Sequence, residues 1–137
     1  MAAQTFKTLL AATLVGVLTS AAVAQETPHG DAAAGEKVFA KCKSCHQVGE
    51  NAKSFSGPEL NGIIGRKAAS LSGYTYSDTM KASGLTWDEA TFRDYIKNPK
   101  AKVTGTKMAF SGLTKDKDID DLEAYLAQYS SDGKKAP

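Results

Sequence analysis

Two cysteines and a histidine are the residues of this chain whose spacing could support chemistry. The only cysteines are Cys42 and Cys45, and His46 directly follows the second. This C-x-x-C-H pattern is typical of covalent haem attachment. Two thiols three positions apart on one helical face can reach the two vinyl groups of one porphyrin, with the imidazole beneath the iron. The motif therefore predicts one haem c, attached through two thioether bonds, with His46 as an iron ligand.

Three other uses of the cysteine pair remain as alternatives. A thioredoxin-like redox motif requires a βαβ context, and the sequence has no such pattern. A structural zinc site requires four nitrogen or sulfur ligands, and the only other histidine, His29, is distant. A disulfide between Cys42 and Cys45 is compatible with export, but it gives His46 no role.

The N-terminal 24 residues have the features of an export signal. Lys7 is the only charged side chain among them, and the apolar stretch at 9–18 is shorter than the ~20 residues that span a bilayer. Residues 22–24 (AVA) have the small-x-small pattern cut by a signal peptidase. We expect residues 1–24 to be a cleaved signal peptide and residues 25–137 to be one periplasmic domain. An uncleaved membrane anchor is the alternative.

The size and charge of the remaining 113 residues limit the function classes. Their length suits a single domain. Without Lys7 they contain 16 basic and 15 acidic side chains, so the chain is nearly neutral. Nucleic-acid binding normally requires a clear basic excess. We therefore expect no nucleic-acid partner, and we expect a monomer.

Helices must position the attachment motif, and the first and last are the clearest. Residues at three-and-four spacing predict a helix over 32–45, with Asp31 as its N-cap. A last helix begins after a capping Thr114. Its apolar stripe consists of Ile119, Leu122, Tyr125, Leu126 and Tyr129.

The middle of the chain is less regular. A short helix is predicted over 76–82, ended by Gly84, and a third begins in the capping-box pattern at 86–89 and stops at the Asn-Pro pair 98–99. Residues 47–72 have no sustained period, and such a long irregular stretch in a small domain requires a partner that organises it. Three or four helices without a strand pattern predict a single all-α domain.

The motifs together resemble a known family, the class I c-type cytochromes, which are small soluble proteins of bacterial periplasm and mitochondria. Beside the CKSCH motif at 42–46, the matching blocks are 57–62 (GPELNG), 65–67 (GRK), 73–78 (GYTYSD), 85–87 (LTW), 98–100 (NPK) and 105–110 (GTKMAF). The resemblance implies a cytochrome c domain of three to four helices and long loops wrapped around one haem.

The resemblance also implies the second iron ligand. Met108 lies in the block that matches the family's ligand loop. Met80 lies on a predicted helix, where a methionine is expected to fill space in the hydrophobic core. With His46 and Met108 on both faces, the protein is expected to be a soluble electron carrier rather than an enzyme. Its iron would cycle between ferric and ferrous by outer-sphere transfer. The alternative is a peroxidase-like haem enzyme or a gas sensor with an open sixth position.

The family pattern assigns roles to residues around the haem. The carbonyl of Pro58 is expected to accept the Nδ1–H of His46, and Tyr95 and Thr106 are expected to hold the Met108 side. The residues expected to bind the propionates are Arg66, Tyr76 and Trp87. An ordinary core role is the alternative for Trp87 and Tyr95. Gly35 and Phe39 are expected to pack closely against Leu122 and Tyr125 of the last helix.

Partners follow from the resemblance as a set of classes. They are a membrane cytochrome bc complex, a terminal oxidase, a photosynthetic reaction centre or a periplasmic reductase. The lysines that flank the motif and the ligand loop are Lys41, Lys43, Lys53, Lys100, Lys102 and Lys107. Such a patch would steer acidic partners into transient complexes at a membrane. The alternative is an ordinary solvated surface.

Overall fold

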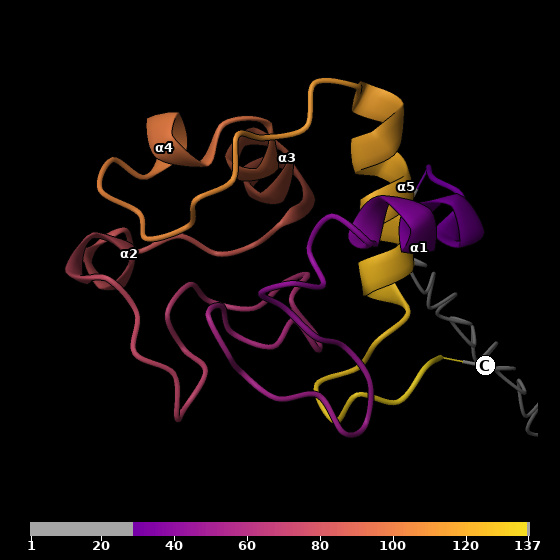
Figure 1. Cartoon of the computed structure of the whole chain (residues 1–137), viewed down its shortest axis with the longest axis horizontal. Coiled ribbons are helices and arrows are strands. Elements are labelled where there is room, and N and C mark those ends of the chain that lie inside the picture. Colours follow the sequence, from indigo (N-terminus) through magenta and orange to yellow (C-terminus); the bar gives the residue numbers. More distant parts are fainter. Residues whose placement is uncertain (1–28, 137) are drawn as a thin grey trace, which may run out of the picture.

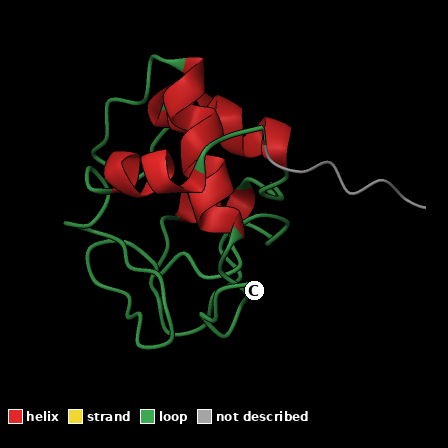
Figure 2. Cartoon of the chain, turned by 90° about the vertical axis from the view of Figure 1, so that its right-hand side faces the viewer, coloured by secondary structure: helices red, strands yellow, loops and turns green. Residues whose placement is uncertain are grey.

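The computed structural model describes residues 29–136 (Figure 1). Five helices follow one another, namely α1 (Ala32–Phe39), α2 (Asp78–Ala82), α3 (Glu89–Lys97), α4 (Pro99–Lys102) and α5 (Asp116–Ala127). Figure 2 shows helices and loops without a strand in this part of the chain. The all-α prediction is therefore confirmed, with one more helix than expected. The predicted signal peptide lies outside the described residues.

The pairing of α1 with α5 joins the two ends of the domain, and the two helices cross in Figure 1. Gly35 lies at the crossing, where a Cβ atom would come 2.7 Å from the Cβ of Tyr125 and would also meet the backbone carbonyl of Asp121. The rings of Phe39 and Tyr125 pack with their centroids 5.3 Å apart. The predicted close approach of these helices is confirmed, because only a residue without a side chain fits at Gly35.

The N-terminus of α1 is fixed by two aspartates. The carboxylate of Asp31 accepts the N–H groups of Ala33 at 2.8 Å and Ala34 at 3.2 Å. The N–H of Asp31 itself donates to Oδ1 of Asp121, on α5, at 2.8 Å. The first turn therefore has a cap of its own and a bond to the last helix.

The first helix is shorter than predicted. α1 ends at Phe39, whereas the sequence pattern extends to 45. Beyond Phe39 the chain tightens into turns, in which the N–H of Cys42 bonds to the carbonyl three residues before it at 2.8 Å. Side chains at 40–45 keep nearly the same spacing in such turns, so the helical periodicity continues past the helix end.

Four helix starts also differ from the prediction. α2 begins at Asp78, with Ser77 as its N-cap, instead of at residue 76. Asp88, rather than Thr86, caps α3, because its Oδ1 accepts the N–H of Thr91 at 2.8 Å. α5 begins after Lys115 instead of Thr114 and has no side-chain cap, although two aspartates occupy its first turn. The unpredicted α4 forms because Asn98 caps a turn that has a proline at its first position.

Long loops cover the side of the domain below the helices in Figure 1. Buried Asn61 ties together two parts of the loop between α1 and α2, since its Oδ1 accepts the N–H of Gly49 at 2.8 Å and its Nδ2 donates to the Gly49 carbonyl at 3.0 Å. The N–H of Gly62 donates to the carbonyl of Tyr129 at 2.9 Å. This loop is therefore held by specific bonds within itself and to the C-terminal segment.

Hydropathy gives no indication of a membrane span within residues 29–136, where no helix has the length and apolar character required to cross a bilayer.

Candidate functional site

A cavity of about 340 Å³ lies between the helices and the long loops. Its wall includes all four predicted site residues, Cys42, Cys45, His46 and Met108, although the methionine is more than sixty positions away in the sequence. Much of the remaining wall is apolar or aromatic and includes Phe39, Ile63, Met80, Trp87, Phe92, Tyr95, Ile96, Leu122 and Leu126. The fold therefore brings the thiols, the imidazole and the thioether into one largely apolar chamber.

The attachment motif occupies a tight turn after α1. The N–H groups of Cys45 and His46 both donate to the carbonyl of Cys42, at 3.0 and 2.9 Å. Both cysteines are half-buried free thiols, not a disulfide. In the chain without haem, burial raises the pKa of the Cys42 thiol to about 11, so this thiol is neutral at physiological pH. The turn presents two unpaired thiols to the chamber.

His46 is held by the loop that follows it. Its Nδ1 lies 2.7 Å from the carbonyl oxygen of Pro58, so Nδ1–H donates this bond and the Nε2 lone pair is left for another partner. Burial is the main cause that lowers the pKa of His46, and the neutral imidazole is the form that binds a metal. The predicted contact with Pro58 is confirmed.

Gly57 completes the support of the imidazole. A Cβ atom at this position would lie 2.7 Å from Nδ1 and 2.8 Å from Nε2 of His46. Only glycine lets the backbone pass so close to the ring. Sequence reasoning missed this residue, although its place beside Pro58 in the GPELNG block was a signal that could have indicated it.

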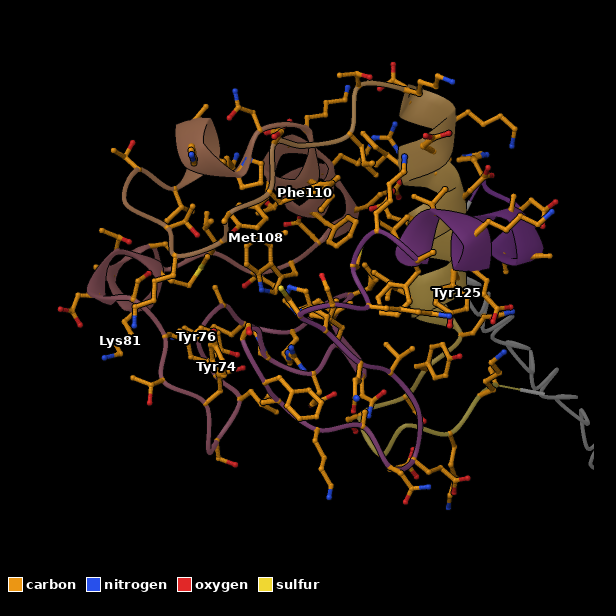
Figure 3. The ribbon with its side chains drawn as sticks, viewed as in Figure 1. Tyr74, Tyr76, Lys81, Met108, Phe110 and Tyr125 are labelled. Carbon is orange, nitrogen blue, oxygen red and sulfur yellow. The ribbon has the colours of Figure 1, made fainter. Side chains whose placement is uncertain are left out.

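Met108 lies in a loop without regular structure, on the chamber wall (Figure 3). Its N–H donates to Oγ1 of Thr106 at 3.3 Å, and the same oxygen lies 2.9 Å from the hydroxyl of Tyr95. Burial raises the pKa of Tyr95, which keeps its hydroxyl protonated. The predicted polar contacts on the Met108 side are confirmed, and they link the loop to α3.

The three residues expected to bind propionates all line the chamber, but they differ in their availability. Trp87 is buried and Tyr76 is half-buried. Arg66 already donates to the carbonyls of Asn61 and Glu59 at 2.9 and 3.0 Å, and its Nη1 lies 3.5 Å from Oε1 of Glu59. The guanidinium is therefore held by the loop, and its charge faces the chamber from a fixed position.

Tyr74 is a second residue that the sequence analysis missed. Its hydroxyl donates to the carbonyl of Ser56 at 2.8 Å, and its ring packs edge-on against Tyr76, with centroids 4.8 Å apart (Figure 3). Ser56, Tyr74 and Tyr76 all line the chamber. This bond ties together two distant parts of the loop between α1 and α2, both of which line the chamber.

Met80 is buried on α2, at 7% exposure, as its interpretation as core filler predicts. Its sulfur lies 4.0 Å from the hydroxyl of Ser83 and lines the chamber from a different element than Met108.

A haem fits the chemistry of this chamber. Two free thiols could bond to its vinyl groups, a neutral imidazole and a thioether could bind its iron, and the apolar wall matches the porphyrin faces. Arg66 and the hydroxyl of Tyr76 supply polar groups for its acidic edge.

Comparison with known proteins identifies the class. Residues 32–130 match the family described as cytochrome c. Cytochrome c-554 of Methylosinus trichosporium is 59% identical over 128 residues, 93% of this chain and 94% of the relative. Cytochrome c2 of Rhodoblastus acidophilus is 55% identical over 106 residues, 77% of this chain and 99% of the relative. A solved structure of cytochrome cH from Methylobacterium extorquens has a TM-score of 0.68 at 50% identity, covering 72% of this chain and 99% of that one.

The chain therefore belongs to the cytochrome c family. Its cofactor is one covalently bound haem c, and its function is that of an electron carrier whose haem iron alternates between ferric and ferrous states.

Proposed function

We propose that this protein is a closed electron carrier whose haem is joined to Cys42 and Cys45 and whose iron is bound by His46 and Met108. The observation that carries this assignment is the oriented imidazole of His46, with Nδ1 on Pro58 and Nε2 unassigned, in the same chamber as the half-buried thioether of Met108. With both His46 and Met108 bound, the iron would have no open position, which argues for outer-sphere transfer and against a peroxidase or gas sensor. Haem c supplies the one-electron couple.

Groups of the protein itself are expected to set the reduction potential of the haem. The bond from His46 to Pro58 fixes the tautomer and makes the imidazole a stronger donor. A neutral thioether favours the ferrous state, and His/Met ligation raises the reduction potential. Much of the surrounding wall is apolar, so it would limit the access of water to a bound haem.

The visible spectrum tests the ligand assignment. The purified holoprotein is expected to give a low-spin spectrum, with a methionine–iron band in the ferric form and no change when carbon monoxide is added to the ferrous form. Met108→Ala should lose the band and bind carbon monoxide. Met80→Leu is the matched control and should keep both properties of the native protein. A native protein that binds carbon monoxide readily would refute the assignment.

Docking of acidic redox partners is proposed to use the lysines that flank the attachment motif and the ligand loop, of which Lys41 and Lys107 line the chamber. Lys41 lies 3.8 Å from Asp118, and Lys102 lies 2.9 Å from Asp94. Within residues 29–136, the four members of the patch that form no salt bridge are Lys43, Lys53, Lys100 and Lys107, and all four are exposed. These uncompensated charges support steering of an acidic partner. The partner classes proposed are a cytochrome bc complex, a terminal oxidase, a reaction centre or a periplasmic reductase.

The salt dependence of electron transfer tests this patch. The rate with an acidic partner should fall steeply with added salt, because screening shortens the reach of the lysine charges. Lys107→Gln should lower the rate at low salt and flatten the dependence. Lys134→Gln is the control, since Lys134 pairs with Asp132 and does not line the chamber. A flat salt response of the native protein would contradict the patch.

Export is proposed to place the carrier in the periplasm after removal of residues 1–24. The signal-like pattern before Gln25 supports this placement. Mass measurement of the protein released from the periplasm should show a chain that begins at Gln25. An intact N-terminus in the membrane fraction would instead support an anchor.

A further inference from the structure

A buried acidic side chain lies between α3 and α5. The side chain of Glu123 is only 7% exposed, and its Oε2 accepts from Nη1 of Arg93 at 3.1 Å. Its Oε1 is buried and has no hydrogen-bond partner among the described residues. A buried carboxylate oxygen without a donor is uncommon in folded proteins, because the ionised group loses its hydration and gains nothing in exchange.

Arg93 cannot neutralise Glu123 by itself, because it is shared. Its Nη1 also bonds to Asp120, and its Nη2 lies 3.8 Å from Asp116. Lys97, the other cation of this network, forms a salt bridge with Asp116 at 2.6 Å. The acidic groups of the network therefore outnumber its basic groups.

The remaining charges that act on Glu123 come from α3 and α5. Burial is the main cause that raises its pKa to about 7, the neighbouring charges of Glu89 and Asp120 raise it further, and Arg93 opposes them. The geometry and the charge count agree that the ionised form of Glu123 is poorly compensated.

The position of Glu123 relates it to the haem chamber. Its neighbours on α5, Leu122 and Leu126, line the chamber. On α3, the neighbours of Arg93 that line it are Phe92, Tyr95 and Ile96. Glu123 does not line the chamber itself, but the two helices that its bond with Arg93 joins both contribute to the wall. Apolar side chains screen weakly, so a change of charge inside the chamber acts on a group beside that wall more strongly than it would through water.

We propose that Glu123 is a proton site linked to the redox state of the haem, binding a proton when the iron is reduced and releasing it when the iron is oxidised. In the forward direction one electron arrives from the redox partner, Fe(III) becomes Fe(II), and the Glu123 carboxylate takes one proton from solvent to become the carboxylic acid. The reverse step returns the electron to the acceptor and the proton to solvent. This inference rests on the proposed haem site.

The direction of the linkage follows from the charges. The positive charge added by ferric iron stabilises the ionised carboxylate, and reduction removes that charge. The pKa of Glu123 is therefore higher in the ferrous protein than in the ferric one. Between the two pKa values the midpoint potential falls as pH rises, because the uptake of each electron is then accompanied by the uptake of up to one proton. At pH values below or above that window, Glu123 has the same protonation in both redox states and contributes no pH dependence to the midpoint potential.

The test compares midpoint potentials of native protein and Glu123→Gln between about pH 5 and about pH 9. The amide keeps the shape of the side chain but cannot titrate. The native potential should fall with pH near neutrality, and the variant should lose this fall. Glu89→Gln is the matched control: it removes a like charge from α3, so the fall should keep its size and move to lower pH. A variant with the native pH profile would overturn the proposal.

A second measurement does not depend on any variant. Carbon NMR of the Glu123 carboxyl in native protein labelled at glutamate follows its titration directly in each redox state. A higher pKa in the ferrous state supports the linkage, and equal values in the two states overturn it. Failure of the haem site would be recognised separately, since the visible spectrum would then lack the low-spin and methionine features at every pH.

Discussion

The hydroxyl of Tyr95 lies 2.9 Å from Oγ1 of Thr106, and this oxygen in turn accepts the N–H of Met108 at 3.3 Å. The bond therefore connects α3 to the loop that positions the proposed sixth ligand. Tyr95→Phe removes the hydroxyl and leaves the ring, so the loop should be less firmly held. We expect the methionine–iron band to be lost at lower pH than in the native protein.

The cost of Tyr95→Phe to the free energy of unfolding should be about 1 kcal/mol, the usual value for one hydrogen bond. Alkaline titration of the methionine–iron band measures the pH at which the band is lost. Denaturant unfolding measures the change in the free energy of unfolding. Tyr129→Phe is a suitable control, since its hydroxyl bonds to Tyr125 rather than to the ligand loop. Equal behaviour of the two variants in the alkaline titration would show that Tyr95 does not support the loop.

Gly35→Val should destabilise the crossing of α1 and α5. The new side chain would meet the Asp121 carbonyl and the Cβ of Tyr125, which belong to the opposite helix. Overpacking of this kind costs about 3 kcal/mol, so the melting temperature of the holoprotein should fall. Ala33→Val, at an exposed position of the same helix, controls for the lower helix propensity of valine. An unchanged melting temperature would contradict the close approach.

Asp121 should make the stability of the domain sensitive to acid. Its bonds to the N–H of Asp31 and to Lys117 lower its pKa, so the folded state favours the carboxylate. This stabilisation is present above the unfolded pKa near 3.8 and is lost as pH falls through the lower folded value. Asp121→Asn should therefore melt at a lower temperature than native protein at neutral pH, and the difference should narrow at about pH 3.

Thermal melts at both pH values measure this effect. Asp118→Asn is the comparison, because Asp118 forms only a partly exposed pair with Lys41, at 3.8 Å, and this pair should contribute little to stability. If Asp121→Asn lowers the melting temperature by the same amount at both pH values, the carboxylate charge is not what stabilises α1.

Glu123 should have the opposite pH dependence. Its folded pKa of about 7 exceeds the ordinary value of 4.5, so the folded state holds the proton more tightly. The free energy of unfolding should fall as pH rises from about 4.5 to about 7, by roughly 3 kcal/mol as an upper limit. Glu123→Gln should remove this fall. Denaturant unfolding at about pH 5 and about pH 8 measures the fall in the free energy of unfolding. If the variant retains this fall, another titrating group causes it.

Much of the site could be predicted from the sequence because its chemistry is local. Cys42, Cys45 and His46 are contiguous, and the blocks around Pro58 and Met108 match a family pattern, so their roles could be predicted before their positions were known. The bonds of His46 to Pro58 and of Tyr95 to Thr106 confirm the two predicted contacts. The iron ligands themselves stay a prediction until the spectrum is measured.

The remaining features depend on tertiary contacts that no local pattern encodes. The end of α1 at Phe39 could not be read from a periodicity that the following turns share. A glutamate in the middle of an amphipathic helix is normally expected on the solvent side, and Glu123 is buried only because α3 packs over it with Arg93. Arg66 was expected to face a propionate, yet its bonds to the Glu59 loop follow from the path of the backbone.

The crossing of α1 and α5 also has a consequence for the order of events during maturation. The attachment turn directly follows α1, and Leu122 and Leu126 of α5 form part of the wall behind it. That wall is complete only after the last quarter of the chain has been made and docked. The chamber that surrounds a bulky planar group is therefore completed by α5, the last helix of the sequence.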